Sequence, residues 1–243
     1  MRYLNRWFIN SYVSIFLLIV VISCNKSDLV GPDPKDSYQY FPIEVGDYKL
    51  FRKVVYSYSG KKEQIDSLLV KEIVTSKTEN KNEIYYTIER QVKGKNDLFF
   101  KPETIFQIIT NLKQVIKAEK NVYTVLLHYP VYLTSEWNVN QINGQEPKIA
   151  EIVENGTLPP SLITDKDIIK VLGDSTNNVV SYLVDCHIFA KNIGLIYEEK
   201  TDLEYCQESE IDNPDSITNC TGKKIIEIGK REFITLLEHG KVK

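Results

Sequence analysis

Apolar and polar residues alternate with a period of two along most of the chain after Tyr38. Within residues 82–92, for example, Ile84, Tyr86 and Ile88 fall on one face of an extended chain and mostly polar residues fall on the other. This alternation is typical of a β-strand with one buried face. It predicts nine strands, at residues 47–58, 65–76, 82–92, 103–110, 112–119, 122–129, 181–191, 194–202 and 223–237.

Turn-forming residues separate these segments at hairpin spacing, as in Ser59-Gly60, Gly94-Lys95-Asn96 and Asn177-Asn178. Closely spaced strands joined by polar turns predict an antiparallel meander. The expected fold class is therefore mainly β, in a single domain whose sheet is strongly curved or forms an open or closed barrel. Residues 161–172, which follow Pro159-Pro160, also permit a helix.

The first 24 residues have the layout of an export signal. Arg2 and Arg6 precede the aliphatic run 13–22, which is too short to cross a bilayer core. The run ends in Val21-Ile22-Ser23-Cys24, which resembles a bacterial lipobox. We expect cleavage before Cys24 and acylation of its thiol. The alternative is an uncleaved anchor helix from about Trp7 with an incidental cysteine.

Three segments follow from this interpretation. Residues 1–23 are the predicted lipoprotein signal peptide, 24–37 the lipidated cysteine and a flexible tether, and 38–243 the β-rich domain. Cleavage of the signal peptide would remove two of the 30 basic side chains and none of the 33 acidic ones. The mature chain would then have a net charge of −5. This balance argues against a nucleic-acid partner, which would require a basic surface.

Several motifs carry a family resemblance. The stretches YFPIEVGDYKLF, YYTIER, SEWNVNQIN, FAKNIGLIYEE and a late C…CTGKKIIEIGKREF stand in the order found in a group of uncharacterised envelope lipoproteins from Bacteroidetes. The resemblance implies an exported, mostly β protein anchored by lipid to the cell envelope, with the outer membrane as the expected location. It supplies no catalytic residue. Where this group usually has Tyr-Trp, the chain has Tyr48-Lys49, a departure to which we assign little consequence.

One motif suggests a ligand surface. Trp137, Asn138, Asn140 and Asn143 combine an aromatic ring with amides, as carbohydrate sites often do. The same residues also suit a core anchor followed by a turn, because asparagine side chains bind nearby backbone groups in turns. Both interpretations remain open from the sequence.

Four cysteines have separate expected roles. Cys24 is assigned to lipid. Cys206 and Cys220 flank a polar loop, and in an exported protein this context favours a disulfide. Cys186 falls on the apolar face of a strand, where a buried, unreactive thiol is expected rather than a nucleophile.

The sequence offers no recognisable catalytic motif. It contains neither G-x-S-x-G, H-E-x-x-H nor a phosphate-binding glycine loop, and its three histidines, His128, His187 and His239, are widely separated. We therefore expect no catalytic residue, no metal site and no cofactor.

Three classes of function remain. The first expectation is a non-enzymatic envelope module that binds or supports a partner such as an envelope protein or a glycan. The alternative is a carrier of a lipid or another apolar ligand in a half-barrel cavity. A hydrolase is the third class. A cavity would favour the carrier, a filled core the module, and a cleft holding a histidine beside a carboxylate the enzyme.

Overall fold

The strands lie where the alternation places them, with three further strands between them. The structure is a computed structural model that describes residues 34–60, 62–153, 167–207, 220 and 222–242. A short helix, α2 (Pro34–Tyr38), precedes the strands. The strands are β1 (Asp47–Ser59), β2 (Lys62–Asn80), β3 (Glu83–Gly94), β4 (Lys101–Thr110), β5 (Gln114–Glu119), β6 (Val122–His128), β7 (Glu136–Asn138), β8 (Ile149–Val153), β9 (Ile168–Asn177), β10 (Ser181–Ala190), β11 (Gly194–Tyr205) and β12 (Ile226–Lys241).

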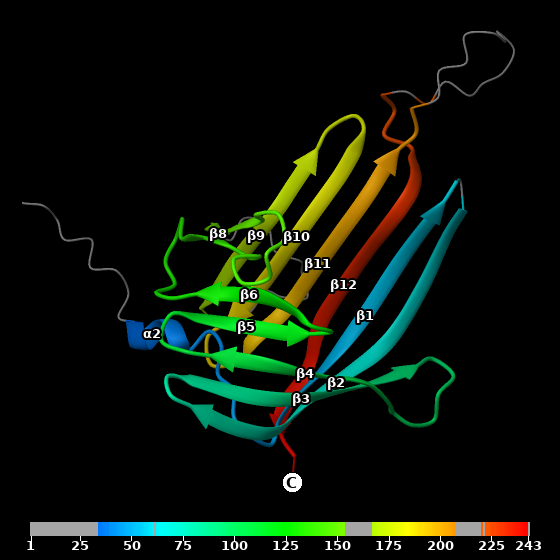
Figure 1. Ribbon diagram of the computed structural model, residues 1–243. Coiled ribbons are helices and arrows are strands. Elements are labelled where there is room, and N and C mark those ends of the chain that lie inside the picture. Colours follow the sequence, from blue (N-terminus) through cyan, green and yellow to red (C-terminus); the bar gives the residue numbers. More distant parts are fainter. Residues whose placement is uncertain (1–33, 61, 154–166, 208–219, 221, 243) are drawn as a thin grey trace, which may run out of the picture. The chain divides into compact units, whose positions relative to one another are not determined.

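All twelve described strands belong to one antiparallel sheet, which confirms the predicted fold class. The spatial order is β6-β5-β4-β3-β2-β1-β12-β11-β10-β9-β8-β7. Each strand therefore pairs with its sequence neighbours, except that β6 and β7 form the two edges, and the first and last strands pair with each other from Asp47↔Lys241 to Ser59↔Ile228. Figure 1 shows β3 to β6 running across the direction of β9 to β12. The sheet is thus curled almost into a closed barrel.

The remaining gap lies between the two edge strands, β6 and β7. The Val125 amide donates to the Val139 carbonyl at 3.0 Å, and the Trp137 indole N–H donates to the Val125 carbonyl at 3.1 Å. We call these two bonds the seam. The seam joins the edges at one place, whereas every other neighbouring pair of strands forms a ladder.

β-bulges account for much of the curvature. Register shifts leave one unpaired residue at Leu237 of β12 in the β1–β12 ladder, at Thr75 of β2 in the β2–β3 ladder, and at Ile196 of β11 in the β10–β11 ladder. An extra residue in one strand bends it and increases its local twist. Gly194 pairs with Ala190 beside the β11 shift and has a φ of +86°, a left-handed conformation that glycine adopts without strain.

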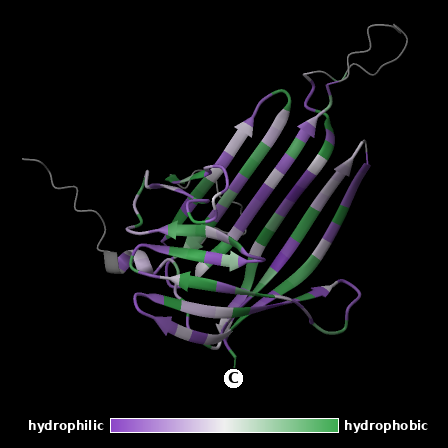
Figure 2. Ribbon diagram, in the orientation of Figure 1, coloured by the Kyte–Doolittle hydropathy of each residue, from purple (hydrophilic) through white to green (hydrophobic). Residues whose placement is uncertain are grey.

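The core has two parts because some strands are covered on both faces. The larger cluster includes Ile88, Phe106, Trp137 and Phe189, whereas the smaller one includes Cys186, Ile188 and Tyr197. Adjacent residues Ile188 and Phe189 therefore belong to different clusters. Figure 2 shows hydrophobic and hydrophilic residues alternating along the strands.

One prediction about secondary structure was wrong. The helix allowed at 161–172 does not reach its predicted end, because Ile168 to Leu172 belong to β9. Ile169 packs against the larger cluster and Ile168 and Leu172 against the smaller one, so both faces of this strand are apolar. Two-sided burial removes the polar positions that make alternation visible.

The beginning of the chain is described only in part. The signal peptide and Cys24 lie outside the described residues. The described structure begins at Pro34, before the expected domain start at 38, and Ser37 is already buried, with its hydroxyl accepting a hydrogen bond from the Val131 amide at 2.9 Å. Among the described residues, no helix is both long and apolar enough to cross a membrane.

Candidate functional site

The curled sheet encloses an open cavity of about 1350 Å³. This volume exceeds the range of about 300–1,000 Å³ common for small-molecule sites. Its apolar walls come from nearly every part of the sheet and from the segment after α2. Representative apolar lining residues are Phe41, Phe51, Val70, Ile88, Phe106 and Phe189.

Charged side chains also line the cavity, in equal numbers of each sign. Within the described residues, the eight cations are Lys49, Lys53, Arg90, Lys117, Lys120, Lys148, Lys200 and Lys241, and the eight anions are Glu44, Asp47, Glu72, Glu103, Glu119, Asp185, Glu198 and Glu232. Most of them form ion pairs, some within one strand, some between strands and some with a loop residue. The cavity therefore combines apolar surface with charge that is largely neutralised in place.

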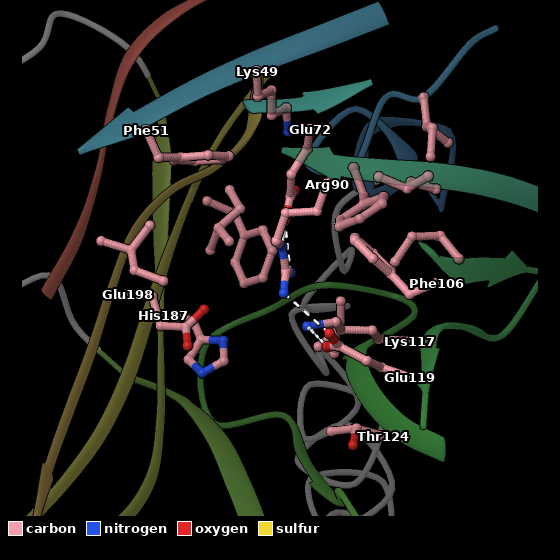
Figure 3. Close-up of a pocket in the computed structure, with 18 of the residues that line it drawn as sticks. Lys49, Phe51, Glu72, Arg90, Phe106, Lys117, Glu119, Thr124, His187 and Glu198 are labelled. Atoms are coloured by element: carbon pink, nitrogen blue, oxygen red, sulfur yellow. Dashed lines mark hydrogen bonds and ion pairs between the residues drawn. The ribbon is translucent and has the colours of Figure 1, made fainter. Parts of the chain in front are cut away.

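Arg90 organises the charge on one wall. Its Nε and Nη2 atoms donate to Glu72 Oε1 at 2.9 and 2.7 Å, and its Nη1 donates to Glu119 Oε1 at 3.0 Å. The guanidinium carbon lies 4.7 Å from the ring centroid of Phe106, and Lys117 Nζ lies 4.9 Å from the same centroid. Charge-assisted bonds of this kind are among the stronger hydrogen bonds in proteins. Figure 3 shows Arg90 between Glu72 and Glu119.

A second group of charges lies on β10 and β11. His187 Nε2 lies 2.9 Å from Asp185 Oδ1, and Lys148 Nζ lies 2.6 Å from Asp185 Oδ2. On the neighbouring strand, Lys200 Nζ donates to Glu198 Oε1 at 2.7 Å. Figure 3 shows His187 and Glu198 across the cavity from Arg90.

The protonation of this second group follows from burial and from its ion pairs. Burial lowers the pKa of His187, although Glu198 and Asp185 oppose this effect, so the imidazole is neutral at pH 7. Burial alone would raise the pKa of Glu198, but the charges of His187 and Lys200 hold it at about 2. With His187 neutral, Lys200 is the partner that keeps Glu198 ionised at neutral pH.

Lys49 also lies in the cavity wall, but its ammonium is not paired with a carboxylate of the described chain. It is half-buried on β1, and within the described residues its Nζ atom makes neither a hydrogen bond nor an ion pair. The nearest recorded partner is the ring of Phe41, whose centroid lies 5.7 Å from Nζ. Burial lowers the pKa of Lys49 to about 8, while Glu72 and Asp47 act in the opposite direction. The ammonium is therefore mostly charged at pH 7.

The structure brings the four residues of the predicted ligand surface together around a turn. Trp137 and Asn140 border the cavity, and Trp137 is only 5% exposed. Asn138 Oδ1 accepts hydrogen bonds from the Asn140 and Lys148 amides, at 2.9 and 3.0 Å. Asn140 donates to the Glu146 carbonyl at 2.7 Å, and Asn143 donates to the Tyr123 carbonyl at 3.0 Å. These are the contacts of a core anchor and a turn, and a ligand surface there stays a prediction.

The described cysteines lie where the sequence suggested. Cys206 and Cys220 are joined by a disulfide, with their Cα atoms 5.7 Å apart. Cys186 is free and buried, and burial raises its pKa to about 11. Such a thiol carries almost no nucleophilic thiolate at pH 7. In the described part of the chain, no cluster of three or more His, Cys, Asp or Glu side chains is arranged to hold a metal ion.

The cavity charges were not identified from the sequence, although one signal pointed to them. Arg90 continues the inward face of Ile84, Tyr86 and Ile88, so the alternation places a charge among core positions. Lys49 was judged a minor departure, yet it lies in the cavity. The ion-pair partners come from other strands, and their identity depends on the strand register.

Comparison with known proteins identifies no family. No protein-family model matches the chain, and a search of curated proteins also gives no match. The Bacteroidetes resemblance therefore stays a prediction.

Two solved structures resemble the chain at low similarity. One is described as an exported protein with a YmcC-like fold from Bacteroides fragilis, with 10% identity and a TM-score of 0.41. The other is described as a lipoprotein from Parabacteroides distasonis, with 9% identity and a TM-score of 0.39. Each likeness covers 83% of this chain and 98% of the other one. At this level of similarity neither one indicates a function.

Proposed function

We propose that this protein is an exported, lipid-anchored binding protein that holds an amphipathic small molecule in the cavity without changing it chemically. The observation that carries this proposal is the open cavity of about 1350 Å³ inside the curled sheet. A module that only supports a partner has no need of such a space, since a filled core is more stable than a hollow one.

The lining indicates the kind of ligand. Partly exposed apolar lining residues such as Phe41, Leu195 and Ile234 favour a ligand with an apolar body. The paired charges of Arg90 and Glu119 add polar contacts in the same cavity. An amphipathic molecule matches both kinds of surface, whereas a purely polar one would leave the apolar walls without a partner.

A cavity-filling variant tests this function. Thr124 lines the cavity on β6, and Thr124→Trp places a large ring in its space. The matched control, Thr78→Trp, adds the same ring at an exposed position of β2. We expect the fluorescence of N-phenylnaphthylamine, a neutral apolar probe, to rise with the wild-type protein and with Thr78→Trp. Thr124→Trp should reduce the increase several-fold, and an equal increase in all three proteins would contradict the proposal.

One observation favours a second candidate, a hydrolase. His187 and Asp185 share a hydrogen-bonding contact in the cavity, and the neutral imidazole has the state required of a general base. Within the described residues, the lining contains neither serine nor cysteine, so a hydrolase here would use His187 to activate water or a threonine hydroxyl, that of Thr104 or Thr124. Turnover of an ester or glycoside that is lost in His187→Gln, with the fold intact, would support this candidate.

The proposed location rests on the N-terminal sequence. If Cys24 is acylated, Cys24→Ser should release the protein from the membrane fraction and leave its signal uncut. The proposal places the protein in the cell envelope, at the outer membrane, with membrane contact through the lipid and no nucleic-acid partner. A Cys24→Ser protein that is still processed and still sediments with membranes would contradict it.

A further inference from the structure

Within the described residues, Lys49 differs from most other cations of the cavity because its ammonium forms no ion pair. Lys53, Arg90, Lys117, Lys148, Lys200 and Lys241 each form an ion pair with a carboxylate of the wall. Lys120 also lacks a recorded pair within the described residues, but its side chain is exposed. Lys49 is thus the one half-buried cation of the described lining whose charge no ion pair neutralises.

The strand register explains why Lys49 is left without a partner. Glu72 is directly opposite Lys49 in the β1–β2 ladder, so it is the natural carboxylate for this lysine. Arg90 instead holds Glu72 through two hydrogen bonds. A planar guanidinium holds a carboxylate more firmly than an ammonium does. The carboxylate of Glu72, which is directly opposite Lys49 in the ladder, is therefore already bound by Arg90.

The chain also keeps space around the ammonium. A side chain at Gly194 would place its Cβ only 2.6 Å from Lys49 Nζ, so a larger residue there would displace the lysine head. Phe41 contributes an aromatic face at 5.7 Å, which favours a cation. An unpaired charge in a half-buried site is costly, and sites that keep one commonly use it.

We propose that Lys49 binds the anionic head group of an amphipathic ligand whose apolar body lies along partly exposed lining residues such as Phe41, Leu195 and Ile234. This inference rests on the proposed function and specifies the class of ligand. A carboxylate or a phosphate would supply the negative charge that Lys49 lacks within the described chain. Lys49 is the one half-buried cation of the described lining without an ion pair, which favours a ligand with a single anionic group.

Binding measurements with matched ligands test this inference. Dodecanoate, dodecyl phosphate and uncharged dodecan-1-ol share one apolar chain and differ in the head group. The variants are Lys49→Met, which keeps a similar length without the charge, and Lys95→Met, the control for loss of an exposed lysine outside the cavity lining. Isothermal titration calorimetry gives the affinity of each purified protein for each of the three ligands.

We expect Lys49→Met to weaken binding of at least one anion by about ten- to a hundred-fold, the usual range for a charge-assisted hydrogen bond. Binding of dodecan-1-ol should change less than about two-fold, and Lys95→Met should leave all affinities nearly unchanged. The anion that loses more identifies the preferred head group.

The outcomes separate this inference from the proposed function. If the wild-type protein binds the alcohol and the anions equally, or if Lys49→Met leaves anion binding unchanged, the role of Lys49 is overturned and the binding cavity stands. If the wild-type protein binds none of the three ligands, the proposed function is overturned together with the inference.

Discussion

Individual charges in this protein occupy positions that the alternation assigns to the core. Arg90 follows Ile84, Tyr86 and Ile88 on the inward face of β3, and its charge is satisfied by Glu72 and Glu119. The sequence predicts the face of such a residue but not its partners, because these belong to strands far away along the chain. Lys49 shows the other outcome, a cation on the inner wall whose expected partner is already bound.

The first residue-scale prediction concerns pH. Burial lowers the pKa of Lys49 to about 8, so its ammonium is lost as the pH rises through that value. The titratable groups near it are Asp47 on its own strand, Glu72 opposite it on β2 and His239 opposite it on β12. We expect the affinity for dodecanoate to fall between pH 7 and pH 9.5 in the wild-type protein.

Lys49→Met is the control for every other group that titrates in this interval. The affinity of Lys49→Met for dodecanoate should be weaker and should not change over the same pH range. The affinity of both proteins for dodecan-1-ol should also stay constant. Parallel pH profiles in the two proteins would show that another group governs the effect.

The second residue-scale prediction concerns stability. A lysine whose pKa is lower in the folded than in the unfolded protein binds its proton more weakly when folded, so it destabilises the fold below about pH 8. Stability then rises with pH from about 8 to 10.5, where the unfolded chain binds more protons. Lys49→Met should therefore raise the free energy of unfolding at pH 7 by about 1–3 kcal/mol.

Urea denaturation at pH 7 and at pH 10 measures this difference. The advantage of Lys49→Met should shrink at the higher pH, where wild-type Lys49 is largely neutral. A destabilised Lys49→Met at both values would show that the lysine supports the fold, contrary to the functional role argued above.

At the scale of elements, the seam between β6 and β7 determines whether the sheet closes. Trp137→Phe keeps an aromatic ring but removes the indole N–H that binds the Val125 carbonyl. We expect a loss of about 1–3 kcal/mol in stability, because a buried carbonyl loses its donor. Hydrogen exchange of the Val125 amide, which donates to Val139 across the same seam, should also accelerate.

An exposed aromatic residue provides the matched control. Tyr132 is 49% exposed, and Tyr132→Phe should change the free energy of unfolding by less than about 0.5 kcal/mol. It should also leave the hydrogen exchange of the Val125 amide unchanged. Unchanged exchange at Val125 in Trp137→Phe would show that the edges are held by other contacts.

The disulfide is the second element-scale feature with a measurable effect. Cys206 and Cys220 are 14 residues apart, and closing a loop of this length stabilises a fold by roughly 3 kcal/mol in the chain-entropy model. Replacing both cysteines by serine should lower the free energy of unfolding by a similar amount. Reductant should lower the free energy of unfolding of the wild-type protein and leave that of the double variant unchanged. An equal free energy of unfolding for the two proteins without reductant would contradict the disulfide.

Sequence alternation identified the strands that have one polar face and missed those that do not. β3 and β10 were predicted closely, because polar residues mark one side of each. β9 was read as the end of a possible helix, since Ile168, Ile169 and Leu172 pack on both sides of the sheet. β7 is three residues long, too short for any periodic pattern.

At the scale of the whole sheet, the cavity depends on curvature that no local pattern records. Bulges in β2, β11 and β12 bend the strands, and the pairing of β1 with β12 joins the first strand to the last. This curvature brings Arg90 and His187 into the lining of the same cavity. The sequence predicted a strongly curved meander and left open whether it encloses a cavity, and the structure shows that it does.

The most direct test of the binding function is native mass spectrometry of the protein purified from its own membrane. The account predicts a species heavier than the acylated polypeptide by the mass of one small amphipathic molecule, released on collisional activation. Thr124→Trp, which fills the cavity, should lose this species, and Thr78→Trp should keep it. Detection of only the bare acylated polypeptide in all three proteins, or of a ligand that Thr124→Trp retains in full, would contradict the central claim.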